Sequence, residues 1–304
     1  MKGRKSLCLL SNLISISLIS PLVVSCARTK EYKTLKLNNT YDLPLQDFNK
    51  VGKLFDKKVT RNVKNKKTGA FEDATYSYWE WLGYAEAKIT HWRDGDTFDA
   101  EITKAPFETI VSSSSLKVGD KIAVRIPTID TLEEHGSNVS EKEKELAKLD
   151  HAYAEKLIPV GTTVRLLSSN WANKSYDRHI ANAFFGENFE QNFATSMLAG
   201  GYTLPRIGDD VKSAFRDDYQ ESIKNSIYGL LLPYLAYAYN WGIENKKGFY
   251  EKHFKNPYEF SKAYESHGEM INSGKYILSQ AYSQDSNIDF KNNIFKFIEK
   301  MNKK

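Results

Sequence analysis

Hydrophobic and polar residues alternate with a period of two through the middle of the chain, and this pattern predicts a series of short β-strands. Residues 85–92 and 97–102 flank the tetrapeptide Arg-Asp-Gly-Asp at 93–96. An Asp-Gly pair between two extended runs is typical of a tight hairpin, because glycine accepts the positive φ that such a turn requires. Further strands are expected within residues 116–129, at 162–167 and at 179–185.

Two segments have the 3.6-residue period of an amphipathic helix. In residues 140–158 the expected apolar stripe consists of Leu146, Leu149, Tyr153, Leu157 and Ile158. Residues 191–200 predict a second helix, ended by consecutive glycines, and helical patterns dominate after Asp209. One helix after the third strand and one after the fifth predict an α+β fold with a small Greek-key barrel and helices packed against it, that is, a five-stranded OB-fold-like β-barrel, plus a C-terminal helical extension over residues 251–304.

Composition narrows the class of protein. Apolar residues make up 41% of the chain and charged residues 27%, which is typical of a globular domain and excludes wholesale disorder, collagen and a coiled coil. The only cysteines are Cys8 and Cys26, which excludes a disulfide framework and a multi-cysteine metal site. The aromatic cluster within residues 71–84 favours a packed edge strand over a base-stacking platform.

The N-terminus has the form of a bacterial lipoprotein leader. Basic residues precede an apolar run over residues 7–24, and the run ends in Val23-Val24-Ser25-Cys26. This end resembles a lipoprotein box, which implies a signal peptide over residues 1–25 and a diacylated Cys26 as the first mature residue. An uncleaved membrane anchor and a buried core helix are the alternatives, but the run is short and polar for a membrane span. Two acyl chains would hold the exported protein on the outer face of the cell membrane, as in the lipoproteins of mollicutes that this leader resembles.

The charge of the chain is concentrated near this leader. The whole chain is +5, and removal of the leader's three basic residues leaves +2. Residues 27–69 carry twelve Lys or Arg against four acidic residues, so this segment has a net charge of +8. The remainder of the mature chain therefore has a net charge of −6. We expect residues 26–82 to form a lipidated basic tether and aromatic lead-in, in which the basic stretch is a solvated spacer, a contact for anionic head groups or a nucleic-acid arm.

Three short motifs carry the candidate chemistry. They are Asp94-Gly95-Asp96-Thr97, then Arg125-Ile126-Pro127-Thr128-Ile129-Asp130-Thr131-Leu132-Glu133, then Tyr176-Asp177-Arg178. In this order and spacing they resemble the staphylococcal nuclease (thermonuclease) family, which has an Asp-Gly-Asp-Thr hairpin, an Arg-x4-Asp-Thr-x-Glu strand end and a Tyr-x-Arg turn. The resemblance covers a domain at residues 83–250, about half the chain, and includes residues 245–250, similar to the family's closing Lys-Lys-x-Leu-x-Trp.

The resemblance implies a calcium-dependent phosphodiesterase. Asp96 and Asp130 would supply two carboxylates to Ca²⁺ and the Thr131 carbonyl a third oxygen, since calcium prefers oxygen ligands. Glu133 would activate or orient the attacking water. Arg125 and Arg178 would hold the phosphate bidentately, which lysine cannot do.

Lys174 and Tyr176 are expected to contact substrate, and Asp94 to belong to the turn. Taken singly, each of these groups is also compatible with a turn residue, a surface ion pair or a solvated charge. The six histidines show no metal-ligand spacing and are interpreted as structural or surface residues.

Three positions depart from the family pattern. Leu132 replaces a proline and should loosen the entry to the following loop. Pro127 falls in the strand that carries Arg125, where proline forfeits a ladder hydrogen bond and could re-aim the arginine. Asp177 places an acidic residue next to Arg178 and could weaken substrate affinity.

The sequence therefore predicts a surface-anchored, calcium-dependent endonuclease that hydrolyses DNA and RNA with low sequence specificity, for nucleotide scavenging or attack on host extracellular DNA. The partners expected are these nucleic acids and the membrane, with no obligate protein partner. The alternative is a catalytically inactive nucleic-acid-binding surface lipoprotein or adhesin. Loss of the key residues would favour this alternative, whereas all six key positions are filled here. A solute-binding lipoprotein is disfavoured because no βαβ alternation is present.

Overall fold

The computed structural model describes residues 30–38, 41–65, 68–109, 114–265, 271–282 and 292–303. The predicted signal peptide and Cys26 lie outside these residues. Within the part that is described, no helix is both long and apolar enough to cross a bilayer.

The elements alternate between strands and helices in the first two thirds of the chain and are helical thereafter. The N-terminal elements are η1 (Glu31–Lys33), η2 (Leu45–Asp56), β1 (Lys58–Lys64), β2 (Phe71–Ser77) and α1 (Tyr78–Trp81). The central elements are β3 (Ala85–Asp94), β4 (Thr97–Lys104), β5 (Lys121–Arg125), β6 (Thr128–Asp130), α2 (Glu141–Leu157), β7 (Thr163–Leu167), β8 (Lys174–Ser175), β9 (Arg178–Ile180), β10 (Asn182–Phe185), η3 (Glu187–Phe189), β11 (Gln191–Asn192), α3 (Phe193–Gly200) and β12 (Leu204–Arg206). The C-terminal elements are α4 (Asp209–Glu221), α5 (Ile227–Glu244), α6 (Phe249–Lys252), α7 (Pro257–Ser261), α8 (Ile271–Gly274), η4 (Gln280–Tyr282) and α9 (Ile294–Met301).

An eight-stranded sheet in the order β11-β10-β7-β3-β4-β5-β9-β8 forms a curled half-barrel, and the fold is mixed α+β as expected. Neighbouring strands are antiparallel except β5 and β9, where Val124 pairs with His179 in parallel register. Ala181 alone separates β9 from β10, although β9 pairs with β5 and β10 pairs with β7. The predicted strand at 179–185 is therefore broken in two, and this break brings β5 and β7 to the same short segment.

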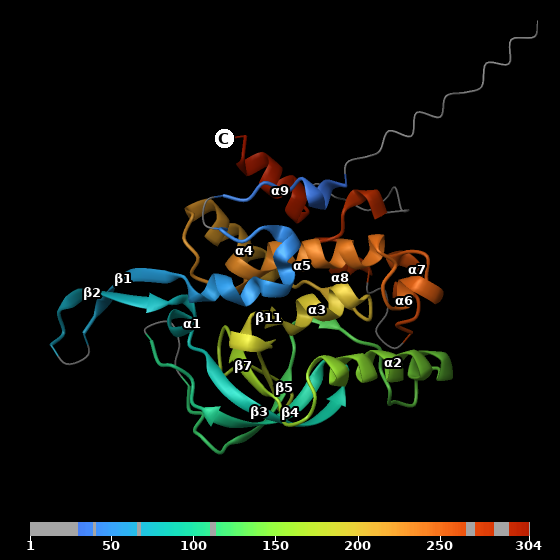
Figure 1. The fold of residues 1–304 in the computed structure, drawn as a ribbon, viewed down its shortest axis with the longest axis horizontal. Helices are drawn as coiled ribbons and strands as arrows, with labels where there is room; N and C mark the ends of the chain where they lie inside the picture. Colours follow the sequence, from blue (N-terminus) through green and yellow to red (C-terminus); the bar gives the residue numbers. More distant parts are fainter. Residues whose placement is uncertain are drawn as a thin grey trace, which may run out of the picture.

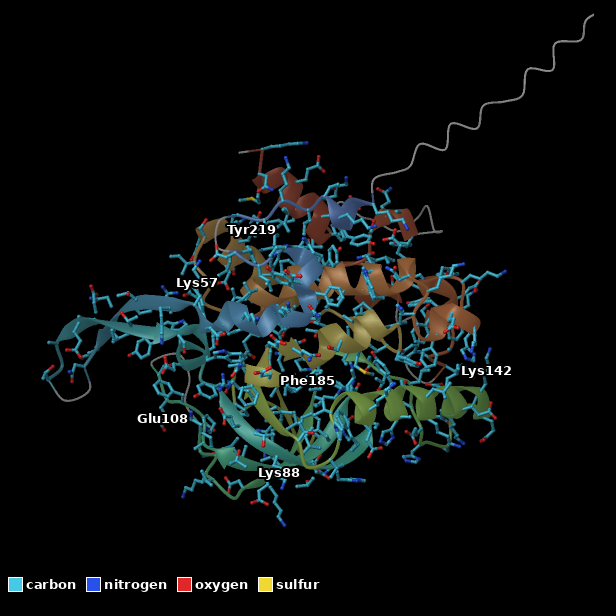
Figure 2. All side chains as sticks on the ribbon, viewed as in Figure 1. Lys57, Lys88, Glu108, Lys142, Phe185 and Tyr219 are labelled. Atoms are coloured by element: carbon cyan, nitrogen blue, oxygen red, sulfur yellow. The ribbon has the colours of Figure 1, made fainter. Side chains whose placement is uncertain are left out.

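Helices cover one side of the curled sheet (Figure 1). α3 lies between the sheet and α5, and Phe185 of β10 is buried at this boundary (Figure 2). A Cβ on Gly242 of α5 would lie 2.6 Å from the carbonyl oxygen of Leu198 in α3. Glycine is therefore required where the two helices approach most closely.

Helix α2 begins after Ser140, whose side chain accepts a hydrogen bond from the Glu143 backbone N–H, as a helix cap does. The predicted apolar stripe is partly wrong, because Leu149 is 45% exposed. The buried face instead consists of Glu143, Leu146, Ala147, Asp150 and Ala154. Two carboxylates thus lie on the side of α2 that packs against the protein.

The expected tether is folded in its described part, which corrects the spacer prediction. Phe55 of η2 is fully buried, with its ring centroid 4.8 Å from that of Trp79 and 5.1 Å from that of Phe184. β1 pairs along its whole length with β2, and this ribbon extends from the body of the molecule (Figure 1). Trp79 and Trp81 lie on α1 rather than on an edge strand and are buried, so they pack in the core.

The C-terminal region is helical as predicted, but its described helices are short and belong to the same core as the rest of the chain. Phe260, Tyr264, Ile277 and Ile294 are at most 1% exposed. In Figure 1, α9 lies beside the N-terminal segment that contains η1. The region beyond residue 250 therefore contributes to the packing of the domain.

Candidate active site

The residues of the three motifs meet where several short strands of the sheet end or begin. Asp96 occupies the turn between β3 and β4, Arg125 is the last residue of β5, and Asp130 is the last residue of β6. Register brings the first two together, because Arg125 pairs with Thr97 across β4 and β5. Arg178 is the first residue of β9, on the other side of β5.

Asp96 and Asp130 form a buried carboxylate pair, with 1% and 2% of each residue exposed. Arg125 Nη2 lies 2.9 Å from Asp96 Oδ2 and also bonds to Asp130 Oδ1. The Thr131 N–H donates to Asp96 Oδ2 at 3.1 Å, and the Thr97 hydroxyl donates to Asp96 Oδ1 at 3.0 Å. Both carboxylates therefore converge on a single cationic group.

Burial raises the pKa of Asp96 well above its ordinary value, because desolvation disfavours the charged carboxylate. The Arg125 guanidinium opposes this rise in pKa, while the charges of Asp94 and Asp130 add to it. Asp94 itself accepts a hydrogen bond from the Asp96 N–H at 3.1 Å, which fits the turn role expected for it.

Gly95 is required by close packing and not by a positive φ, which corrects the reason given by the hairpin pattern. A Cβ at Gly95 would lie 2.4 Å from Asp150 Oδ1 and 2.9 Å from Thr131 Cγ2. The tight approach holds the turn that carries Asp96 against the segment that follows Asp130.

Pro127 does not interrupt the strand that carries Arg125. β5 ends at Arg125, Pro127 follows in the link to β6, and Thr128 has a φ of 70°. The Ile126 N–H still donates to the Asp96 carbonyl at 2.9 Å. The position of Arg125 is therefore set by a complete ladder, and the expected loss of a ladder hydrogen bond is wrong.

Arg178 is connected to the carboxylate pair through a hydroxyl. Its Nη1 donates to Thr97 Oγ1 at 3.3 Å, and Thr97 in turn donates to Asp96. The neighbouring Asp177 forms an ion pair with Arg93, 3.7 Å between Nη1 and Oδ2, on the exposed surface. Asp177 thus has a cationic partner other than Arg178. Tyr176 stands at the tip of the β8–β9 hairpin with 91% of the residue exposed.

The segment after Asp130 is attached to α2. The Leu132 N–H donates to Asp150 Oδ2 at 3.0 Å, and Leu132 itself is buried. The Glu133 N–H reaches Glu143 Oε1 at 3.5 Å. Leu132 is therefore an anchored point of the chain, where the sequence predicted a loosened loop entry.

An open groove of about 570 Å³ lies in front of the carboxylate pair. The predicted site residues that line it are Arg125, Asp130, Glu133, Tyr176 and Arg178. Asp96 and Thr131 are buried behind it. Lys174 does not line this groove and instead borders a second hollow together with Asp177 and His179.

Four residues of the site were missed by sequence reasoning. Arg206 lies on β12 with its Nη1 3.5 Å from Asp130 Oδ1. The hydroxyls of Thr203 and Tyr264 both donate to the Asp130 carbonyl, at 2.8 and 2.7 Å. Asp150 is fully buried, and desolvation raises its pKa well above the ordinary value. Only Asp150 had a signal in the sequence, a carboxylate one turn after Leu146 on the buried face of α2.

Asp96 and Asp130 are the two carboxylates of the site that could contribute oxygen ligands to a hard divalent cation. Among the residues that the structure describes, no three His, Cys, Asp or Glu side chains are grouped closely enough to hold a metal by themselves. Asp96 and Asp130 already share one cationic partner, and carboxylate oxygens suit Ca²⁺ or Mg²⁺. Such an ion would complete its coordination with backbone oxygen, water or phosphate.

The chain is similar to lipoproteins of Mycoplasma, whereas no protein-family model matches it. It is 34% identical over 140 residues to "Uncharacterized lipoprotein MG186" of Mycoplasma genitalium, over 43% of this chain and 49% of that protein. It is 32% identical over 190 residues to the homologue in Mycoplasma pneumoniae, over 51% of this chain and 62% of that protein. The matches thus span roughly half to three fifths of these relatives. Their names fit the lipoprotein prediction and a membrane-anchored protein.

Proposed function

We propose that this chain is a surface-anchored, calcium-dependent endonuclease similar to staphylococcal nuclease. One observation carries the proposal: Asp130, Arg125, Arg178 and Glu133 line one groove, and Asp96 lies buried behind it, joined to Asp130 through Arg125. Each of these groups comes from a different turn or strand end. Carboxylate and guanidinium groups gathered at one groove are suited to the hydrolysis of a phosphodiester.

The fold supports the same proposal. The curled sheet and the break at Ala181, which brings one short segment to both β5 and β7, are compatible with an OB-fold-like barrel of five principal strands. The helices on one side of the sheet leave the ends of β5, β6 and β9 on the groove. OB-fold proteins use such strand faces and loops to bind nucleic acids.

Asp96, Asp130 and the Thr131 carbonyl are the groups that would hold Ca²⁺. A bound calcium ion supplies positive charge to the phosphate and lowers the pKa of bound water. Arg125 and Arg178 present planar guanidinium groups from neighbouring strands, which suits bidentate contacts to phosphate oxygens. Glu133 accepts a proton from the attacking water or orients that water. Because the cationic groups contact phosphate and not bases, cleavage has little sequence preference and extends to RNA.

The proposed location follows from the leader. Diacylation of Cys26 would hold the enzyme on the outer face of the cell membrane, where nucleic acids from the surroundings are its substrates. Nucleotide scavenging or attack on host DNA is the proposed use.

The test compares cleavage with binding. The full chain, purified in detergent, is incubated with plasmid DNA and with single-stranded RNA, in calcium or in a chelator. We expect degradation only with calcium and its loss in Glu133→Gln. Glu145→Gln removes an exposed carboxylate from α2 and serves as the control that keeps activity. Retention of nucleic acid in a gel shift, with no cleavage in calcium, would support the inactive binding protein instead.

A further inference from the structure

We infer that Arg206 is a third phosphate-binding arginine, which makes the groove a site for an extended strand and not for a single nucleotide. The inference rests on the proposed function. Arg206 lies outside the three motifs and reaches the site through long-range pairing. β12 runs antiparallel to β6, with Arg206 opposite Thr128 and Leu204 opposite Asp130.

The side chain of Arg206 combines proximity with exposure. Its Nη1 lies 3.5 Å from Asp130 Oδ1, and it lines the same groove as Arg125 and Arg178. The Arg206 side chain is 62% exposed, whereas that of Arg125 is 14% exposed. A long ion pair with so much solvent access contributes little to stability, so the guanidinium can exchange Asp130 for a substrate phosphate at small cost.

The backbone below this side chain is held firmly. The Ile207 N–H donates to the Ser273 carbonyl at 3.1 Å, and the Leu204 N–H donates to the Tyr264 hydroxyl at 3.1 Å. A Cβ on Gly274 would lie 3.0 Å from Pro205 Cγ, so α8 packs directly on β12. A flexible cation on a fixed strand is suited to a phosphate whose position varies along a chain.

The other charges of the groove set the extent of this contact. Asp210, near the start of α4, also lines the groove and would repel a phosphate. Among the described residues that line the groove, the cationic side chains are those of Arg125, Arg178 and Arg206, so two arginines are assigned to the scissile phosphate and one to its neighbour. Arg206 should therefore matter for oligonucleotides more than for the shortest substrates.

The experiment measures binding of a 12-nucleotide single-stranded DNA to the full chain in detergent, as a function of salt and with calcium. Every protein carries Glu133→Gln, so that the probe is cut too slowly to affect the binding measurement. Arg206→Gln should weaken binding about three- to tenfold. The slope of log affinity against log salt should become shallower by about 0.7, the value for one phosphate contact on a single strand.

Two matched variants and a second substrate separate this role from a structural one. Arg206→Lys should recover most of the salt slope, because it keeps the charge. Arg216→Gln removes an arginine from α4 that does not line the groove, and should bind as the parent does. In the background with Glu133 intact, Arg206→Gln should raise KM on the 12-mer more than on a dinucleotide.

An unchanged salt slope in Arg206→Gln, or an equal rise of KM on both substrates, would overturn the inference. So would a failure of the parent protein to bind the 12-mer. Binding with the expected slope change, but no cleavage by the protein with Glu133 intact, would sustain the role of Arg206 and remove only the nuclease proposal.

Discussion

At the scale of single residues, the site separates groups that are buried from groups that reach solvent. Asp96 and Asp130 are almost fully buried and tied to Arg125, with only Asp130 of the two reaching the groove lining, while Glu133 and Arg178 are partly exposed at the groove. Burial strengthens the electrostatic interaction of the pair with any cation, because the local dielectric constant is low. In the proposed enzyme, the exposed groups would contact substrate and water. This division predicts different consequences for substitutions in the two sets.

Glu133→Gln should lower kcat by a factor on the order of 10² to 10⁴, the usual contribution of a general base. The amide keeps the size of the side chain and its hydrogen-bonding reach but cannot accept the proton from water. Calcium affinity and the thermal unfolding midpoint should change little. Steady-state cleavage of a fluorescent oligonucleotide checks the rate, and full activity in this variant would remove the proposed role of Glu133.

Arg178→Lys tests the requirement for a planar guanidinium. Lysine keeps the charge but offers one point contact, so kcat/KM should fall by roughly 10² or more. In the native protein Arg178 Nη1 donates a hydrogen bond to the Thr97 hydroxyl at 3.3 Å, and the substitution would weaken this bond. Arg93→Lys provides the comparison, because that arginine pairs with Asp99 on the surface away from the groove. Equal activity of the two variants would contradict the phosphate contact of Arg178.

At the scale of elements, the site depends on short strands whose partners are distant in sequence. β6 consists of three residues and pairs with β12, and Tyr264 spans the two. The Tyr264 hydroxyl donates to the Asp130 carbonyl and accepts from the Leu204 N–H. The region beyond residue 250 therefore fixes the strand that carries a candidate metal ligand.

Tyr264→Phe should lower the free energy of unfolding by about 1 to 3 kcal/mol, because it leaves the buried Leu204 N–H without its hydroxyl partner. Calcium affinity should fall as well, since Asp130 loses one of the two hydroxyls that hold its carbonyl. Urea unfolding and calorimetric titration measure the two effects. Tyr258→Phe, at a partly exposed ring, is the control. Unchanged stability in Tyr264→Phe would show that Thr203 holds the strand alone.

The difference between local signals and long-range pairing explains which elements the sequence could predict. The hairpin of β3 and β4, helix α2 and strand β7 were found because their signals are local: alternation, an Asp-Gly turn and helical spacing. The motifs located Asp96, Arg125 and Asp130, and the structure brings these three into contact. Arg206 was missed because β6 pairs with β12 about 75 residues away, and Tyr264 because it lies 134 residues from Asp130 in the sequence; no local pattern encodes either contact.

At the scale of the whole molecule, the N-terminal segment is part of the fold. The basic composition of residues 27–69 predicted a tether, since lysine-rich stretches are usually solvated. The described part instead packs against the helical layer, where Tyr41 lies 6.3 Å from Tyr234 of α5, between ring centroids. The basic composition gave a wrong prediction because a few buried aromatic residues determine the packing of this segment, while its many lysines stay at the surface.

The same N-terminal segment helps to enclose a lysine. Lys224 is fully buried, its Nζ donates to the Asp218 carbonyl at 3.2 Å, and it lies 4.8 Å from the ring centre of Tyr41 and 5.4 Å from that of Tyr219. Tyr219 belongs to α4 in the helical layer (Figure 2). Burial lowers the pKa of Lys224 to about 8, although Asp218 opposes the change.

This shift gives the whole molecule a pH-dependent stability. Between pH 8 and pH 10 the unfolded chain keeps the proton on Lys224 and the folded chain has lost it, so stability rises with pH in this window. The slope from this one group approaches 1.4 kcal/mol per pH unit. Below pH 8 both states are protonated and the slope from this lysine vanishes. Above pH 10 ionisation of tyrosines in the unfolded chain acts in the opposite direction.

Lys224→Met should remove the rise in stability between pH 8 and pH 10 and should raise stability near pH 7, because methionine fills the site without a buried charge. Urea unfolding at half-unit intervals of pH measures the slope directly. Lys148→Met, at an exposed position of α2, should leave the slope unchanged. If the variant at 224 keeps the full rise, then another group titrates, and the N-terminal segment does not contribute to stability through an enclosed lysine.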